Sequence, residues 1–201
     1  GWDRKCDFID PMCGSGTFPI EAALLANNIP SGRNRKFGFE TWGNYDEDIW
    51  NEVKAEAESK IINSDVKIFA QDIDNQAIDI AFANAKRAGV QDLITFDKID
   101  FFHSSHDTGS GIIVMNPPYG ERLQVDEITN FYQDMGSRLK HFYHGCDAWI
   151  ISSNYQALKN FGLRTSRKIK LFNGPLECRL QKYELYQGSK KISKQSDEQV
   201  S

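Results

Sequence analysis

Strand-like and helix-like segments alternate along most of this chain, and this alternation constrains its fold more than any other feature. The predicted strands are short apolar segments at residues 8–9, 66–70, 93–96, 111–115 and 148–151. The predicted helices carry apolar residues at helical spacing and span residues 18–27, 75–88 and 128–142. Asp74 is the expected cap of the second helix, and Gly89 is its expected end. Such alternation predicts an α/β fold with a doubly wound, mostly parallel sheet.

The end of the chain follows a different pattern. Residues 168–172 and 179–186 are strand-like, and the segment between them, Asn-Gly-Pro-Leu-Glu, is typical of a hairpin connection. An antiparallel hairpin at the end of a parallel sheet is unusual among dinucleotide-binding folds. The final residues, 188–201, are polar and rich in Lys, Ser and Gln, and we expect them to be disordered.

Length and composition indicate a soluble globular protein. The 201 residues suffice for one domain with a full core, or for two small ones. The hydrophobic content of 40% and the charged content of 26% are ordinary. No apolar run approaches the ~20 residues that a membrane span needs. The N-terminus has no signal-peptide pattern and does not begin with Met, so we expect a cut through a longer protein.

The cysteines and the net charge limit which metal sites, cellular compartment and binding partners are expected. None of the four cysteines belongs to a Cys-x-x-Cys pair, which argues against structural zinc and favours a reduced, cytoplasmic protein. The formal net charge at pH 7 is -4. Because a domain that binds RNA unaided is usually basic, nucleic-acid binding would need a local patch or a further domain.

Residues 29–50 interrupt the alternation. After a basic cluster at residues 33–36, this segment contains five aromatic residues: Phe37, Phe39, Trp42, Tyr45 and Trp50. One interpretation is an insertion whose aromatic side chains pack on the edge of the sheet. The other is that part of the segment forms a lid over a cofactor or substrate.

A glycine-rich turn follows the first predicted strand. Residues 10–17 read Asp-Pro-Met-Cys-Gly-Ser-Gly-Thr and lead directly into a predicted helix. Glycines at such a turn let the backbone approach a ligand toward which the helix amides point. The segment lacks the third glycine of the dinucleotide fingerprint and the Gly-Lys-Ser/Thr of a phosphate loop. Taken alone, it predicts either a ligand site or a tight turn without a ligand.

Carboxylates follow the second and third predicted strands. Asp72 is placed to accept hydrogen bonds from both ribose hydroxyls of an adenosyl ligand, whereas Asp74 is the helix cap. Asp100 is a candidate acceptor for an adenine amino group, with Ile73 or Phe101 against the ring. A surface aspartate that ends the strand is the alternative interpretation of Asp100.

The fourth predicted strand ends in Asn-Pro-Pro-Tyr at residues 116–119. Pro117 and Pro118 force an extended, donor-poor backbone, which leaves the Asn116 side-chain oxygen and the Pro117 carbonyl as neighbouring acceptors. Two acceptors at one point suit a planar amino group, and Tyr119 offers a face on which a base can stack. Acceptors that draw the amine hydrogens make the nitrogen more nucleophilic toward a methylsulfonium. This motif therefore predicts methyl transfer to an exocyclic amine.

Together, residues 10–17 and the Asn-Pro-Pro-Tyr-Gly-Glu-Arg-Leu of residues 116–123 resemble the class I S-adenosylmethionine-dependent amino-methyltransferases. In particular, the chain resembles the bacterial 23S ribosomal-RNA guanine-N2 methyltransferases that carry a THUMP RNA-binding domain. These proteins are often labelled N6-adenine-specific DNA methylases. Residues 38–42 and the hairpin segment 173–178 also resemble that family, so the resemblance runs from residue 7 to residue 186.

The resemblance implies a Rossmann-like, seven-stranded sheet with a C-terminal antiparallel hairpin, and a catalytic domain over residues 1–187. It implies S-adenosylmethionine as cofactor and S-adenosylhomocysteine as product. The implied cofactor-binding residues are Asp10, Pro11, Cys13, Gly14, Ser15, Gly16, Thr17, Asp72, Ile73, Asp100, Phe101 and Asn116. The implied catalytic residues, which hold the amine, are Asn116, Pro117, Pro118 and Tyr119. Family members have a THUMP-like domain and a helix before the glycine motif, and the present sequence contains neither.

Three functions remain open on the sequence. The first is methylation of guanine N2 in 23S ribosomal RNA, and the second is methylation of adenine N6 in DNA or RNA. The Asn-Pro-Pro-Tyr motif cannot separate them, because both bases present a conjugated amine, and only the resemblance favours guanine. The third is a non-catalytic subunit that binds the cofactor or RNA, against which the intact acidic residues and acceptors argue.

Other polar residues receive weaker interpretations. The pairs His103/His106 and His141/His144 have ligand-like spacing, but we expect no metal at either pair. Basic residues near the hairpin are expected to form a solvated face, with contact to substrate phosphates as the alternative. They are Arg164, Arg167, Lys168 and Lys170.

Overall fold

A computed structural model describes residues 1–106, 109–119 and 125–186 of the chain. The chain divides into two compact units, residues 1–98 and residues 99–201. The expected disordered tail at residues 188–201 lies outside the described residues.

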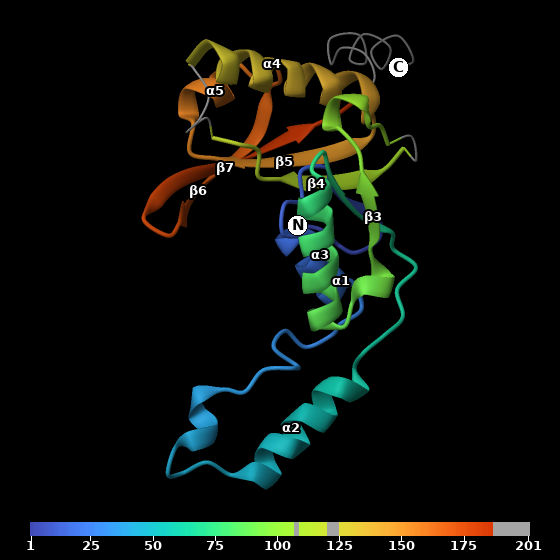
Figure 1. Cartoon of the computed structure of the whole chain (residues 1–201), viewed down its shortest axis with the longest axis vertical. Helices are drawn as coiled ribbons and strands as arrows, with labels where there is room; N and C mark the ends of the chain where they lie inside the picture. Colours follow the sequence, from blue (N-terminus) through green and yellow to red (C-terminus); the bar gives the residue numbers. More distant parts are fainter. Residues whose placement is uncertain (107–108, 120–124, 187–201) are drawn as a thin grey trace, which may run out of the picture. The chain divides into compact units, whose positions relative to one another are not determined.

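The first unit is a three-stranded parallel sheet with helices. Its strands lie in the order β3-β2-β1 and pair in parallel, Phe8 with Ile68 and Ala70 with Phe96 (Figure 1). Its elements, in chain order, are β1 (Asp7–Asp10), α1 (Thr17–Ala26), η1 (Gly38–Thr41), α2 (Glu47–Ser59), β2 (Ile68–Asp72), α3 (Asn75–Ala88), η2 (Gln91–Leu93) and β3 (Thr95–Lys98). The second strand therefore begins two residues later than predicted. The third begins later too, because residues 91–93 form a 3-10 turn.

Helix α3 confirms both of its predicted ends. The Asp74 side chain accepts a hydrogen bond from the Gln76 amide, and Gly89 ends the helix with a positive φ of 74°. Ala81 and Ala85, on one face of the helix, are fully buried. Small side chains on this face let α3 lie close to its neighbours, which becomes important at the glycine turn.

The second unit combines a parallel strand pair with an antiparallel hairpin. Its elements are η3 (Phe101–His103), β4 (Gly111–Met115), α4 (Val125–Phe142), β5 (Cys146–Ser152), α5 (Tyr155–Lys159), β6 (Thr165–Asn173) and β7 (Leu176–Glu184). The strand order is β4-β5-β7-β6, in which β4 and β5 are parallel and β7 is antiparallel to both neighbours. The predicted hairpin is confirmed. Its connection is shorter than residues 173–177, because Asn173 already pairs with Leu176.

Aromatic and aliphatic side chains fill the core of the second unit. Helix α4 buries Ile128, Tyr132, Met135 and Leu139, which repeat at helical spacing as predicted. The rings of Phe161 and Tyr183 stack at 4.5 Å between centroids. The seven strands and their helices form the expected α/β architecture.

The aromatic side chains of the segment after residue 29 form a cluster of their own. The ring of Phe39 contacts those of Phe37, Trp42, Tyr45 and Trp50, so the aromatic residues pack on one another. In Figure 1, helix α2 stands apart from helices α1 and α3 of the same unit. Both the sheet-edge interpretation and the lid interpretation stay predictions. The sequence analysis also missed α2 and α5, because α2 is strongly charged and α5 has five residues.

Gly136 in helix α4 provides a test of this packing. A Cβ at this position would lie 1.7 Å from the carbonyl oxygen of Phe161. Gly→Ala in a helix normally stabilises by roughly 1 kcal/mol. Here we expect Gly136→Ala to lower the free energy of unfolding by about 2 kcal/mol or more, measured by urea denaturation. Gly43→Ala, where a Cβ meets nothing within 4 Å, is the control. An unchanged or raised stability of Gly136→Ala would contradict the described packing of α4 on residue 161.

Candidate cofactor and substrate site

The glycine turn connects β1 to α1 in the first unit. Gly14 and Gly16 have positive φ angles of 52° and 82°, which side-chain-bearing residues rarely adopt. A Cβ on Gly16 would lie 2.9 Å from the Cβ of Ala81 in α3. The second glycine is therefore required both by its backbone conformation and by the close approach of α3. No side chain caps the N-terminus of α1 in the structure, so its first amides remain donors for a ligand.

Asp10 ends β1 and is buried, with 2% of its surface exposed. Its Oδ1 accepts a hydrogen bond of 3.2 Å from the Met12 amide, which shapes the start of the turn. The pKa of the Asp10 carboxyl is raised from 3.8 to about 8, chiefly because the group is buried; the hydrogen bond from the Met12 amide lowers this pKa, and the nearby Asp72 carboxylate raises it. The buried Asp10 carboxyl thus stabilises the turn through its hydrogen bond with the Met12 amide.

Asp72 joins the end of β2 to the glycine turn. Its Oδ2 accepts a 2.9 Å hydrogen bond from the Gly14 amide, and its Oδ1 accepts a 3.0 Å hydrogen bond from the Asp74 amide. A carboxylate has about four lone-pair sites, so two acceptor positions remain for ligand hydroxyls. The structure therefore places Asp72 at the turn itself, next to the residues with which the sequence associated it.

Cys13 lies within the same turn and is buried. Burial, followed by the carboxylates of Asp10 and Asp72, raises the pKa of the Cys13 thiol to about 12. The thiol therefore stays protonated at neutral pH and is a poor nucleophile. Its backbone amide donates to the Gln71 carbonyl at 2.8 Å, which ties the turn to β2. The geometry fits a structural turn residue.

The remaining turn residues differ in exposure. Pro11 is buried, whereas Ser15 and Thr17 are exposed and their hydroxyl oxygens lie 3.4 Å apart. Ile73, directly after Asp72, is 64% exposed. The first unit thus brings the turn and Asp72 together, with an exposed apolar side chain beside them in the chain.

Asp100 and Phe101 belong to the second unit. Asp100 caps the short helix η3 through a 2.9 Å hydrogen bond from the Phe102 amide to its Oδ1, and its Oδ2 lies 3.2 Å from His103 Nδ1. Phe101 is 3% exposed, and its ring stacks on Tyr143 at 6.1 Å. Because its face is occupied by core residues, Phe101 contributes packing, and of the two apolar candidates only Ile73 offers an exposed surface.

The Asn-Pro-Pro-Tyr segment leaves the carboxyl end of β4. Asn116 and Pro118 are exposed, and Pro117 is buried. The Tyr119 hydroxyl donates a hydrogen bond to Asn116 Oδ1, whose second lone pair remains for another donor. Burial, followed by the Cys178 thiol, raises the pKa of the Tyr119 phenol, so that it stays a protonated donor. Residues 120–123, the rest of the motif, lie outside the described residues.

Three supporting residues were not identified from the sequence. The Tyr132 hydroxyl of α4 lies 3.3 Å from the Pro118 carbonyl and 2.7 Å from Ser152 Oγ. Ser152 Oγ accepts from the Asn154 amide, and Asn154 Nδ2 donates to the Tyr119 carbonyl at 3.2 Å. Burial raises the pKa of Tyr132 to about 12, which keeps its hydroxyl a donor. The backbone of the motif is therefore held from α4 and from the end of β5.

The weaker sequence interpretations have partial structural counterparts. Arg164, Arg167, Lys168 and Lys170 are exposed, and Lys170 Nζ pairs with Glu177 at 2.5 Å. His141 Nδ1 lies 2.8 Å from the Ser137 carbonyl of its own helix. Among the described residues, no group of three or more His, Cys, Asp or Glu side chains is arranged to hold a metal ion. No helix in the described part of the chain is both long and apolar enough to cross a membrane.

Comparison with known proteins gives consistent matches. A family model described as an RMKL-like methyltransferase domain matches residues 1–182. The ribosomal RNA large subunit methyltransferase K/L of Vibrio campbellii is 38% identical over 208 residues, which cover 100% of this chain and 29% of that protein. The protein of the same name from Shewanella baltica is 36% identical and covers 94% of this chain and 28% of its own length. The chain thus spans less than a third of the length of these curated relatives.

Solved structures match the whole fold. A candidate methyltransferase in complex with S-adenosylhomocysteine superposes with a TM-score of 0.87 and 31% identity, over 94% of this chain and 50% of the other. A protein from Listeria monocytogenes, described as a predicted N6-adenine-specific DNA methylase, superposes with a TM-score of 0.82 and 35% identity. The match covers 92% of this chain and 48% of the other. These matches confirm the predicted Rossmann-like class I methyltransferase fold.

The buried carboxyl of Asp10 predicts a pH dependence of stability. The folded state holds a proton that the unfolded state releases near pH 3.8, so the contribution is full below that pH and is lost as pH rises through about 8. Asp10→Asn keeps an acceptor for the Met12 amide but cannot ionise. Its free energy of unfolding should therefore exceed that of the wild type at pH 8, by an upper limit of about 5 kcal/mol, and approach it at low pH.

Urea denaturation at pH 5 and pH 8 measures this difference. The exposed Asp97→Asn is the matched control and should follow the wild type at both pH values. The same pH dependence in Asp10→Asn and wild type would show that Asp10 ionises normally in the folded chain.

Proposed function

The chain belongs to the RMKL-like methyltransferase family, and we propose that it transfers a methyl group from S-adenosylmethionine to an exocyclic amino nitrogen of a nucleic-acid base. The observation that carries the proposal is the exposed Asn116 at the end of β4, held in a proline-rich segment whose backbone is anchored by Tyr132 and Asn154. A preorganised acceptor at this exposed position suits an amine donor.

Most of the residues proposed for the cofactor lie in the first unit, and Asp100 belongs to the second. Asp72, already bonded to the Gly14 amide, would accept the ribose hydroxyls, and the turn from Asp10 to Thr17 would face the methionyl part, with the first amides of the uncapped helix α1 as donors. Exposed Ile73 would pack on the adenine ring, and Asp100 would accept its amino group. The solved relative that contains S-adenosylhomocysteine supports this cofactor assignment.

The second unit supplies residues for the amine. Asn116 Oδ1 and the Pro117 carbonyl would each accept one N–H of the target amine, and Tyr119 would stack on the base. Drawing both hydrogens away from the ring plane raises the nucleophilicity of the nitrogen and stabilises the positive charge that develops as it attacks the methylsulfonium carbon. The products are the methylated base and S-adenosylhomocysteine, and the proton of the amine leaves to solvent.

The preferred substrate is guanine N2 in 23S ribosomal RNA. The names of the Vibrio and Shewanella relatives, which are large-subunit ribosomal RNA methyltransferases, support this choice. Adenine N6 is the second candidate, favoured by the description of the Listeria structure. A non-catalytic subunit is the least favoured, because the acceptors and the acidic residues are intact.

The whole protein would contain more than this catalytic domain, which we place at residues 1–187. Because the chain spans less than a third of its relatives, a THUMP-like RNA-binding domain is proposed elsewhere in the whole protein. A substrate in the ribosome implies a cytoplasmic location.

Mass spectrometry of nucleosides from ribosomal RNA tests the substrate. A strain that lacks the gene should lose one N2-methylguanosine from its 23S RNA and regain it on complementation. Loss of N6-methyladenosine instead would establish the second candidate, and unchanged modification of both RNA and DNA would reject the proposed function.

Asn116→Ala tests the role of the acceptor. Loss of one preorganised acceptor costs about 3 kcal/mol at the transition state, so methyl transfer should fall roughly a hundredfold while cofactor affinity stays within about twofold. Radiolabelled methyl transfer and calorimetry measure the two effects in the whole protein. Asn160→Ala, at the exposed residue that follows the C-terminus of α5, is the control. Normal turnover by Asn116→Ala would refute the mechanism.

Asp72→Asn tests the cofactor site independently of the substrate. The wild type should bind S-adenosylmethionine with micromolar affinity, and Asp72→Asn should weaken binding by about tenfold or more, because an amide cannot accept from the Gly14 amide and both ribose hydroxyls at once. Calorimetry compares it with Asp97→Asn, which should bind as the wild type does. Equal affinity of all three proteins would remove Asp72 from the cofactor site.

A further inference from the structure

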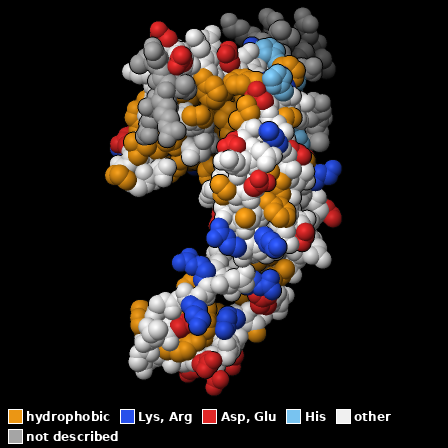
Figure 2. All heavy atoms as spheres, in the orientation of Figure 1, with side chains coloured by type: hydrophobic (Ala, Val, Ile, Leu, Met, Phe, Trp, Pro, Cys, Tyr) orange, Lys and Arg blue, Asp and Glu red, His pale blue; other side chains and the backbone are white. Residues whose placement is uncertain are grey.

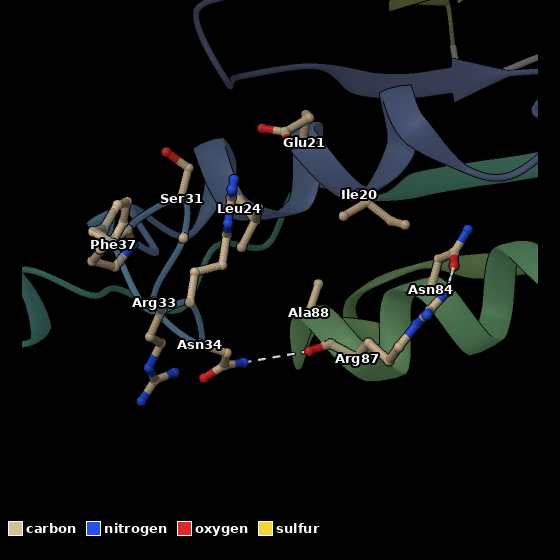
Figure 3. A pocket seen from close by; sticks show the side chains of 13 residues that line it. Ile20, Glu21, Leu24, Ser31, Arg33, Asn34, Phe37, Asn84, Arg87 and Ala88 are labelled. Carbon is tan, nitrogen blue, oxygen red and sulfur yellow. Dashed lines mark hydrogen bonds between the residues drawn. The ribbon is translucent and has the colours of Figure 1, made fainter. Parts of the chain in front are cut away.

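A pocket of about 510 Å³ lies in the first unit outside the residues assigned to cofactor and base. Helix α1, the loop of residues 30–37 and the C-terminal part of α3 form its walls (Figure 3). None of the proposed cofactor-binding or catalytic residues lines it. Any ligand of this pocket would therefore differ from the cofactor and from the target base.

The lining is basic although the chain as a whole is acidic. Arg33, Arg35 and Arg87 line the pocket, against the single carboxylate of Glu21. Residues 27–39 contain three basic side chains and no acidic one, in a chain of net charge -4. Figure 2 shows Lys and Arg side chains gathered on the surface of this unit, and acidic side chains gathered farther along the insertion. The side chains that line the pocket thus carry a net positive charge.

The guanidinium groups of the pocket arginines have N–H donors that are not used in hydrogen bonds within the described part of the chain. In the part of the chain that the structure describes, the Arg35 side chain has no hydrogen bond or ion pair. Arg87 donates to the neutral Asn84 Oδ1, and Arg33 pairs with Glu58 through Nε at 2.6 Å. Each guanidinium has five N–H donors in a planar fork. Arginines that line a pocket with unused donors fit a ligand with several anionic oxygens.

The loop that carries Arg33 and Arg35 is held in place. Gly32 has a φ of 85°, and a Cβ there would lie 2.9 Å from Cζ of Phe37. The Arg35 amide donates to the Gly32 carbonyl at 2.8 Å, and Asn34 Nδ2 reaches the Arg87 carbonyl at 3.4 Å (Figure 3). The arginines of the loop and of α3 are thus connected by a direct contact between their elements.

Helix α3 also connects the pocket to the glycine turn. Asn84 lines the pocket and donates from Nδ2 to the Ser15 carbonyl at 2.8 Å, while its Oδ1 accepts from Arg87. One asparagine therefore contacts both the cofactor turn and a pocket arginine. A strand of nucleic acid that places one phosphate in this pocket would run beside the turn.

We propose that this pocket binds a backbone phosphate of the RNA substrate. The inference rests on the proposed function, in which the substrate is RNA, and it names the part of the chain that holds the RNA backbone. Phosphate oxygens match the planar forks of Arg33, Arg35 and Arg87, and the contact is independent of base sequence. It gives this acidic chain the local basic patch that RNA binding requires.

Charge reversal at the unpaired arginine tests the proposal. In the whole protein, Arg35→Glu should weaken binding of a fluorescein-labelled 23S RNA fragment at least about tenfold, and should lower the slope of log affinity against log salt by about 1. Arg87→Glu should act in the same direction. Lys67→Glu, the same change of charge at an exposed residue outside the pocket, should change RNA affinity by less than about twofold. Calorimetry should give an unchanged affinity for S-adenosylmethionine in all three variants.

The outcomes separate this proposal from the proposed function. RNA affinity of Arg35→Glu equal to that of the wild type or Lys67→Glu would overturn the phosphate site, even if the wild type methylates RNA. Absence of RNA binding by the wild type would overturn it as well. A lowered melting temperature of Arg35→Glu with intact RNA binding would indicate that a protein segment fills the pocket, and would also reject the proposal. Selective loss of RNA affinity would support it, whichever base proves to be methylated.

Discussion

The hydrogen bond from the Gly14 amide to Asp72 joins two parts of the chain that lie 58 positions apart. Around it, the Cys13 amide bonds to the end of β2, and Gly16 lies so close to Ala81 that a methyl group would not fit. The turn between β1 and α1 is therefore shaped by its contacts with β2 and α3 as much as by its own glycines. Every cofactor role proposed for the first unit depends on this arrangement, because the turn amides point at a ligand only when the turn is held against the strand ends.

Burial raises the pKa of ionisable groups in both units and keeps them protonated. In the first unit, burial keeps the Asp10 carboxyl and the Cys13 thiol protonated at pH values at which the same groups would ionise in water. Neither group therefore serves as a nucleophile. In the second, it keeps the phenols of Tyr119 and Tyr132 as donors. Asp10, Cys13, Tyr119 and Tyr132 are thus all held in their protonated forms, and none of these four is activated as a nucleophile. This fits a reaction in which the substrate nitrogen itself attacks.

The distribution of charge explains how an acidic chain could still meet RNA. Acidic residues begin helix α2 at the far part of the insertion, whereas the arginines lie at its start, near α1 and α3. Phosphate contacts depend on the local density of positive charge, since screening confines each charge to about 10 Å at ordinary salt. The net charge of the chain is therefore a poor guide to where a polyanion would bind.

The sequence by itself determined the fold class, the order of the strands, the caps of α3, the hairpin and the motifs at the strand ends. These follow from hydrophobic periodicity, from glycine and proline backbone restrictions and from spacing, all of which are local. Only the tertiary structure decided that Phe101 is a core residue while Ile73 is exposed, that Tyr132, Ser152 and Asn154 hold the Asn-Pro-Pro-Tyr backbone, and that Arg87 meets the loop of residues 30–37. Burial and contacts between distant segments depend on which faces of the helices and strands pack together. The local pattern of a single sequence does not specify this packing.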